Sequence, residues 1–173
     1  MVIVDASVLI GFAKIGRLNL LRRLFDSVAI APAVNEEVVE GGLQVSAPEV
    51  IYVQQALGDG WLEVVPLNAG EEGLKGRLLG TTSIDPGEAE SLAIARLRNM
   101  AILVDDKQAR TVARALGVGY MGSAAVLLEG RVRGELSLED LEHAVGELAR
   151  VVWLSPDIVA DILPPPEYVI ESY

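Results

Sequence analysis

The sequence predicts an α/β domain built around a parallel sheet. Short apolar runs of strand length alternate with segments of helical periodicity, which is typical of strand–helix–strand units with right-handed crossovers. Two of the apolar runs, at residues 2–4 and 101–104, lead directly into aspartates. The 173 residues, 51% hydrophobic and 23% charged, suffice for one domain with a single core.

Two strands and two helices are expected in the first 45 residues. The run VIVDAS (2–7) predicts a strand, and a helix is expected from Leu9 to Leu24. VAIAP (28–32) predicts the second strand, with a short helix around NEEVVE (35–40). The pair Gly41-Gly42 predicts a break.

The middle of the chain is expected to be mainly helical. Residues 47–58 have helical spacing, and WLEVVPL (61–67) predicts an edge or covering strand. Glycine and threonine are frequent at 70–83, which predicts a short helix with a mobile loop. PGEAESLAIARLRN (86–99) again has the apolar spacing of a helix.

A third buried strand, AILVD (101–105), opens the last part of the chain. A helix over 107–117, closed by Gly117, and a short strand at VGYMG (118–122) follow it. Ser137, with Asp140 three residues later, and Ser155 are typical N-terminal helix caps. Three further helices are therefore expected, at 123–133, 137–151 and 156–163.

Composition excludes several kinds of chemistry. The chain has no cysteine, so disulfides, thiol nucleophiles and zinc–cysteine sites are excluded. Its only histidine, His143, lies in a late helix and is expected to be a surface or core residue. Nucleotide-binding glycine motifs are absent. The apolar N-terminus lacks a basic leader and contains Asp5, so it predicts a strand, and a cytoplasmic protein is expected.

The net charge of −11 argues at first against a nucleic-acid partner. Residues 135–173 hold nine acids and one base, a net charge of −8, which leaves −3 for residues 1–134. If several acids of that body bind divalent cations, the body is not acidic in effect. The charge therefore does not exclude RNA.

Acidic residues recur at four places where predicted strands end or helices begin: Asp5, Glu36-Glu37, Glu88 and Asp105-Asp106. Parallel topology brings the carboxyl ends of strands to one edge of the sheet, where ligands bind. Converging carboxylates without a cation cost several kcal/mol. Mg²⁺ or Mn²⁺ removes that cost, because hard cations take oxygen ligands and keep waters for a substrate phosphate.

Each of these acids also has a purely structural interpretation. Asp5 is placed to cap the helix that begins near Ser7. Asp85-Pro86-Gly87-Glu88 fits a helix start, with Asp85 as the cap and Glu88 in the first turn. Glu36 and Glu37 are adjacent and cannot both point inward. Of Asp105 and Asp106, one is expected to cap the next helix and the other to face the site.

The chain resembles the PIN domain over about residues 2–135. This family of metal-dependent ribonucleases includes the VapC toxins of toxin–antitoxin pairs. VIVDASVLIGFAKIG resembles the opening motif, which implies that Asp5 is the first metal ligand and that the Ser7 hydroxyl supports it. APAVNEEVVEG resembles the second motif and places its glutamate at Glu37.

Two further motifs complete the resemblance. DPGEAESLAIA resembles the third acidic motif and places its acid at Glu88, where an aspartate is commoner. AILVDDKQAR resembles the fourth and places its acid at Asp106, with Asp105 as an additional one, although Val104 stands where most relatives have Thr or Ser. LGVGYMGSAAVLLEGRVRGEL resembles a short branch that carries Pro-Gly-Glu-Ala-Glu.

The resemblance implies a parallel-sheet three-layer sandwich that hydrolyses RNA phosphodiester bonds with Mg²⁺ or Mn²⁺. Two ions roughly 3.5–4 Å apart would activate water and stabilise the leaving oxygen. The implied catalytic residues are Asp5, Glu37, Glu88 and Asp106, and the implied metal ligands are Asp5, Glu88, Asp105 and Asp106. Residues 1–135 would form the nuclease domain, and 136–173 an acidic helical extension packed on it. A homodimer and an antitoxin partner are expected.

A basic stripe follows the last acidic motif. Lys107, Arg110 and Arg114 stand at i, i+3 and i+7, on one face of the predicted helix. They would hold RNA phosphates without reading bases; the alternative is a solvated helix face.

Two other functions remain open. Val104 and Glu88 also fit a catalytically weak PIN-like module that binds RNA or protein. Paired aspartates after a strand also occur in phosphorelay receiver domains, but there the pair opens a unit of about a hundred residues or more. A nuclease assay with added metal separates the first alternative from an active enzyme.

Overall fold

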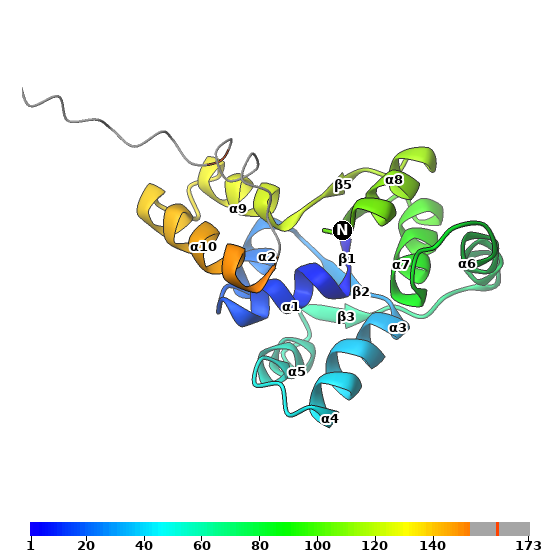
Figure 1. Ribbon diagram of the computed structural model, residues 1–173, viewed down its shortest axis with the longest axis horizontal. Helices are drawn as coiled ribbons and strands as arrows, with labels where there is room; N and C mark the ends of the chain where they lie inside the picture. The colour runs from blue at the N-terminus through cyan, green and yellow to red at the C-terminus, as the bar shows by residue number, and fades with distance from the viewer. Residues whose placement is uncertain (153–161, 163–173) are drawn as a thin grey trace, which may run out of the picture.

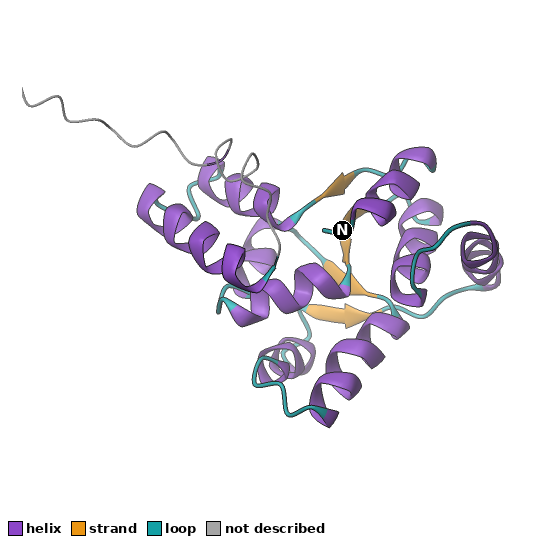
Figure 2. Ribbon diagram, viewed as in Figure 1, coloured by secondary structure: helices purple, strands orange, loops and turns teal. Residues whose placement is uncertain are grey.

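The computed structural model describes residues 1–152 and residue 162. Its centre is a five-stranded, all-parallel sheet with helices on both faces (Figures 1 and 2), as the sequence predicts. The strand order is β3-β2-β1-β4-β5. The strands are β1 (Val2–Val4), β2 (Val28–Ile30), β3 (Leu62–Val64), β4 (Ala101–Leu103) and β5 (Tyr120–Met121).

Burial separates the inner strands from the edge. Every residue of β1 and β2 is buried, which explains why both are unbroken apolar runs. Only Leu62 of β3 is buried, while Glu63 and Val64 are exposed, so the predicted edge strand is confirmed. β1 pairs with β2 on one side and β4 on the other, so the ends of β1 and β4 are neighbours.

Two helical layers cover the sheet. On one side lie α1 (Ala6–Lys14), α2 (Asn19–Leu24), α9 (Ser123–Val132) and α10 (Leu138–Val151), with α5 (Val50–Gly58) packed against α1. On the other lie α6 (Ala69–Thr81), α7 (Pro86–Leu97) and α8 (Lys107–Ala115).

A continuous helical segment connects the two layers. It comprises α3 (Pro32–Asn35), the π-helical turn η1 (Glu36–Gly41) and α4 (Gly42–Gln44). α3 packs against α7, whereas η1 packs against α1 and α5. π-helical turns are rare and are frequently found at functional sites, and this one carries Glu37.

Two predicted boundaries in the first half are wrong. The helix expected from Leu9 to Leu24 is two helices, because Gly16 takes a φ of 65° after α1. The break expected at Gly41-Gly42 is absent, and the helical segment continues through both glycines. A Cβ at Gly42 would clash with the side chain of Val50, so this glycine permits close packing rather than a turn.

The helix expected within 70–83 is longer than predicted and spans Ala69–Thr81, with Asn68 and Glu71 forming a reciprocal cap. The Ser137 cap is confirmed with Asp140, and α10 packs against α1 and α9. The helix expected over 156–163, with its cap Ser155, lies outside the described residues except for residue 162. The domain boundary at residue 135 stays a prediction. No helix in the described part of the chain could cross a bilayer.

Candidate active site

Asp5 follows β1 at the carboxyl edge of the sheet. Its backbone N–H donates to the carbonyl of Leu103 in β4 (2.9 Å), and the residue is only 4% exposed. Ser7 donates both its backbone N–H (3.3 Å) and its hydroxyl (2.9 Å) to the same oxygen, Oδ2. Burial raises the pKa of Asp5, the bonds from Ser7 oppose that rise, and the charge of Asp85 adds to it. The predicted cap is confirmed, and Oδ2 is the oxygen that makes it.

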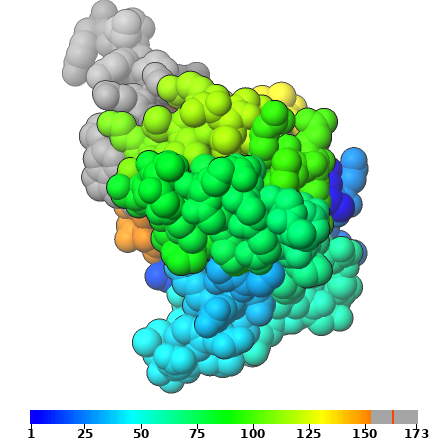
Figure 3. All heavy atoms as spheres, turned by 90° about the vertical axis from the view of Figure 1, so that its right-hand side faces the viewer, coloured from blue at the N-terminus to red at the C-terminus, as the bar shows by residue number. Residues whose placement is uncertain are grey.

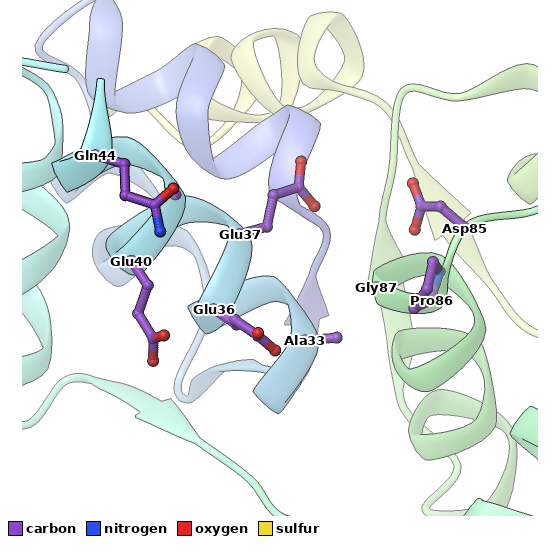
Figure 4. A pocket seen from close by; sticks show the side chains of 9 residues that line it. Ala33, Glu36, Glu37, Glu40, Gln44, Asp85, Pro86 and Gly87 are labelled. Carbon is purple, nitrogen blue, oxygen red and sulfur yellow. The ribbon is translucent and has the colours of Figure 1, made fainter. Parts of the chain in front are cut away.

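Glu37 faces this edge from η1. Figure 4 shows its carboxylate directed across a gap towards Asp85, whereas Glu36 and Glu40 point elsewhere. A Cβ on Gly87 would lie 3.3 Å from Asp85 Oδ1 and 3.7 Å from Glu37 Oε2, so both carboxylates flank this glycine. The cavity between the two segments measures about 560 Å³. Partial burial and the charges of Asp85 and Asp5 raise the pKa of Glu37.

Asp85 and Glu88 cap α7 reciprocally. The Glu88 N–H donates to Asp85 Oδ1 (2.8 Å), and the Asp85 N–H donates to Glu88 Oε2 (3.0 Å). Glu88 is only 6% exposed. Burial raises its pKa to about 7, and the charges of Asp85, Asp106 and Asp5 contribute to that rise. Glu88 therefore caps α7 and also belongs to the acidic group.

The two adjacent aspartates after β4 have different partners. Asp106 caps α8 through one oxygen, Oδ1, which accepts from the N–H groups of Gln108 (2.7 Å) and Ala109 (2.8 Å). Asp105 uses both oxygens on one residue: Oδ1 accepts from the Ser123 N–H (2.8 Å) and Oδ2 from its hydroxyl (2.5 Å). Asp106 is also the aspartate whose charge acts on Glu88, which groups Asp106 with the other acids of this edge.

The acidic group at this edge therefore comprises Asp5, Glu37, Asp85, Glu88 and Asp106. From the sequence, Asp85 is expected to be a cap alone. Its charge nevertheless raises the pKa of three of the other acids. The signal that could have found it is its position, because a residue that caps a helix at the ligand-binding edge faces the same space as the strand ends.

A hard divalent cation fits the chemistry of this donor set. Among the residues that the structure describes, no three acidic or histidine side chains are already gathered closely enough to enclose an ion. Mg²⁺ does not require such a cage, since it keeps several waters and is held by one or two carboxylates together with substrate phosphates. Neighbouring negative charges contribute to the raised pKa values of Asp5, Glu37 and Glu88, and a cation would stabilise such a group of like charges.

Other predicted residues lie around the group. Val104 is buried and donates its N–H to the Met121 carbonyl (2.9 Å), so this position extends the pairing of β4 with β5. Lys107 and Arg114 are exposed on α8, and Arg110 is half-buried. Arg114 donates to the Tyr120 hydroxyl (2.6 Å) and lies 5.8 Å from the centre of its ring.

Comparisons with known proteins agree with this architecture. A family model described as a PIN domain matches residues 1–165. No curated protein matches the chain. The solved structure of VapBC2 from Rickettsia felis, bound to a DNA fragment from their promoter, is similar with a TM-score of 0.54 and 14% identity, covering 70% of this chain and 98% of that one. A toxin-antitoxin complex from Klebsiella pneumoniae has a TM-score of 0.48 and 15% identity, with 62% and 89% covered.

Proposed function

The chain belongs to the PIN-domain family, and from this premise we propose that it is a divalent-metal-dependent ribonuclease that hydrolyses RNA phosphodiester bonds. One observation carries the proposal. Five carboxylates from different parts of the chain lie at the ligand-binding edge, and the pKa values of Asp5, Glu37 and Glu88 are raised there. Such perturbed acids mark functional sites.

We assign Asp5, Glu88 and Asp106 to the cation, Mg²⁺ or Mn²⁺. Each has one oxygen fixed by a backbone N–H at a helix start, namely Asp5 Oδ2, Glu88 Oε2 and Asp106 Oδ1. The caps hold the carboxylates in place, so the second oxygen of each is the one we assign to the ion. A bound divalent cation lowers the pKa of its water and stabilises charge on phosphate oxygens.

Glu37 is assigned to the attacking water. Glu37 is exposed on η1 and faces Asp85 across the cavity. A water bound to Glu37 in this cavity would exchange with solvent. Its raised pKa makes it a stronger base than an ordinary glutamate. Lys107 and Arg110, at the start of α8 next to Asp106, are assigned to the flanking phosphates.

We also propose that the chain is the toxin of a toxin–antitoxin pair. The likeness to VapBC2 concerns the fold, and the partner is inferred by analogy with that paired assembly. A catalytically weak module that binds RNA or protein is the second candidate, favoured by Val104, whose apolar side chain supplies no hydroxyl beside the acids.

RNA cleavage with and without Mg²⁺ or Mn²⁺ tests the proposal. Asp5→Asn should abolish divalent-dependent cleavage because it removes the charge that faces the ion, while the amide still accepts from Ser7. Asp59→Asn, on the exposed end of α5, is the matched control and should cleave normally. Undiminished cleavage by folded Asp5→Asn would remove the mechanism.

A measurement independent of activity accompanies the assay. A cation that binds only the folded state at 100 times its Kd adds about 2.7 kcal/mol to the free energy of unfolding. Mg²⁺ or Mn²⁺ should therefore raise the Tm of the wild type, and this gain should shrink in Asp5→Asn. A wild type that binds RNA, cleaves none and shows no increase of Tm with metal would favour the catalytically weak module.

A further inference from the structure

Glu90 is a buried acid of α7 that lies outside the acidic group. It is 7% exposed and stands two residues beyond Glu88 on a helix that is buried on all sides from Gly87 to Ala95. Its Oε2 accepts from the backbone N–H of Ala33 (2.8 Å), and its Oε1 accepts from Lys75 Nζ (3.0 Å). Glu90 therefore joins three elements, α7, α3 and α6.

The bond to Ala33 is made at the first turn of α3. Pro32 opens that helix without an N–H, so Ala33 carries the first free donor. A carboxylate is favoured there, because the helix dipole and the unpaired N–H groups both attract negative charge. Ala33 precedes Glu37 by four residues on one continuous helical segment, which places both on the same face. Figure 4 shows Ala33 and Glu37 both on the side that faces α7.

Lys75 is the basic partner of the Glu90 carboxylate. The ammonium also contacts Glu72 Oε2 (2.9 Å), and both glutamates raise the pKa of Lys75. Figure 3 shows the α6–α7 face resting directly on the α3–α4 segment. Glu90 has one partner on α3 and one on α6, so it fixes the positions of both helices relative to α7. Loss of either partner would leave one oxygen of this buried carboxylate without a hydrogen bond.

We propose that Glu90 is a positioning residue for Glu37: by holding the N–H of Ala33 against α7, it fixes the helical segment that presents Glu37 to Asp85 and Asp5. The test by RNA cleavage rests on the proposed ribonuclease function. The test by amide hydrogen exchange does not, so the positioning role and the ribonuclease function can fail separately.

A double-mutant cycle tests the catalytic part. Glu90→Ala should lower the rate of RNA cleavage about 10- to 100-fold, the usual loss when a residue that orients a functional group is removed. In a Glu37→Gln background the same change should cause no further loss, because Glu90 acts through Glu37. Glu72→Ala, which removes the other anion from Lys75, is the matched control and should retain the wild-type rate. Losses that add in the double mutant would overturn the proposal.

Amide hydrogen exchange tests the positioning directly. In Glu90→Ala the amides of residues 33–41 should exchange faster than in the wild type, while those of α9 should not change. Glu90→Gln should restore slow exchange and most of the cleavage rate, because its amide oxygen still accepts from Ala33.

If Glu90→Ala does not fold, Glu90→Asp replaces it, since the shorter side chain keeps the charge but cannot span both partners. Unchanged exchange at 33–41 in a folded variant would overturn the role of Glu90. A wild type that cleaves no RNA, combined with faster exchange in the variant, would instead reject the ribonuclease and retain the positioning.

Discussion

Four members of the acidic group are also helix caps. Asp5, Asp85, Glu88 and Asp106 each accept a backbone N–H at a helix start through one oxygen. A carboxylate has two oxygens with about four lone-pair positions, so the cap leaves acceptor capacity and also fixes the group's orientation. From sequence, capping and metal binding look like competing explanations, but the geometry makes them compatible.

Glu88 makes the stability of the metal-free protein depend on pH. Its pKa is about 7 when folded, against an ordinary value of 4.5, so between these values the folded state holds a proton that the unfolded state has lost. The free energy of unfolding therefore falls as pH rises through this window, at up to about 1.4 kcal/mol per pH unit.

Glu88→Gln should flatten this fall, and at pH 8 the variant should be more stable than the wild type. Urea unfolding at pH 5, 6, 7 and 8 with a chelator present measures the difference. Glu142→Gln, an exposed position on α10, controls for the removal of one surface charge. Curves for wild type and Glu88→Gln that stay parallel across the range would show that Glu88 titrates normally.

A second buried acid holds α6 and α7 together. Glu71 is fully buried and receives two bonds from Arg98, Nε to Oε1 (2.7 Å) and Nη2 to Oε2 (2.8 Å). Arg98 Nη2 also donates to the Pro66 carbonyl (2.6 Å), which ties the helix pair to the segment after β3. The bonds from Arg98 lower the pKa of Glu71, so the interaction favours the charged carboxylate.

Arg98→Met should lower the free energy of unfolding by roughly 3–5 kcal/mol, because it leaves an unpaired buried charge. Denaturant unfolding at pH 7 measures the decrease. Adding Glu71→Gln should recover part of it, since the orphaned charge is then gone. Arg96→Met, an exposed change on the same helix, should cost little; an equal decrease at both positions would contradict this role of Arg98.

The basic face of α8 should contribute to RNA affinity through phosphates. Lys107→Gln with Arg110→Gln should weaken binding similarly for different single-stranded sequences. The slope of log K against log salt should also become shallower by about 0.7 for each phosphate that the variant no longer neutralises. Arg131→Gln, exposed on α9, is the control. Equal slopes for the double mutant and wild type would mean that this face meets only solvent.

We predict that the protein is a homodimer. Leu43, Val45, Ile51 and Tyr52 are all more than half exposed around the turn between α4 and α5, and contiguous exposed apolar residues mark interaction surfaces. Two-fold dimers are the commonest small oligomers. Light scattering at micromolar concentration should give about twice 18.4 kDa, and Val45→Asp with Ile51→Asp should return the monomer. A monomeric wild type would refute the prediction.

Features that depend on near neighbours in the chain could be predicted from the sequence. The apolar runs of β1, β2 and β4 and the caps at Asp85 and Ser137 were predictable, because strand burial and capping involve residues a few positions apart. The alternation of strands and helices then predicted a parallel sheet whose carboxyl edge collects Asp5 and the pair Asp105-Asp106. The PIN-domain family followed from the order of these motifs.

Features that depend on residues far apart in the chain could not be predicted in this way. Ser123, eighteen residues further along the chain, donates to both oxygens of Asp105, so the two adjacent aspartates have different partners. The side chain of Val50 lies where a Cβ of residue 42 would be, which explains the glycine at this position. The backbone N–H of Ala33, 57 residues before Glu90, donates to that buried carboxylate. None of these interactions leaves a periodic or local pattern in the sequence, because each arises from packing between elements whose separation along the chain is unrelated to their separation in space.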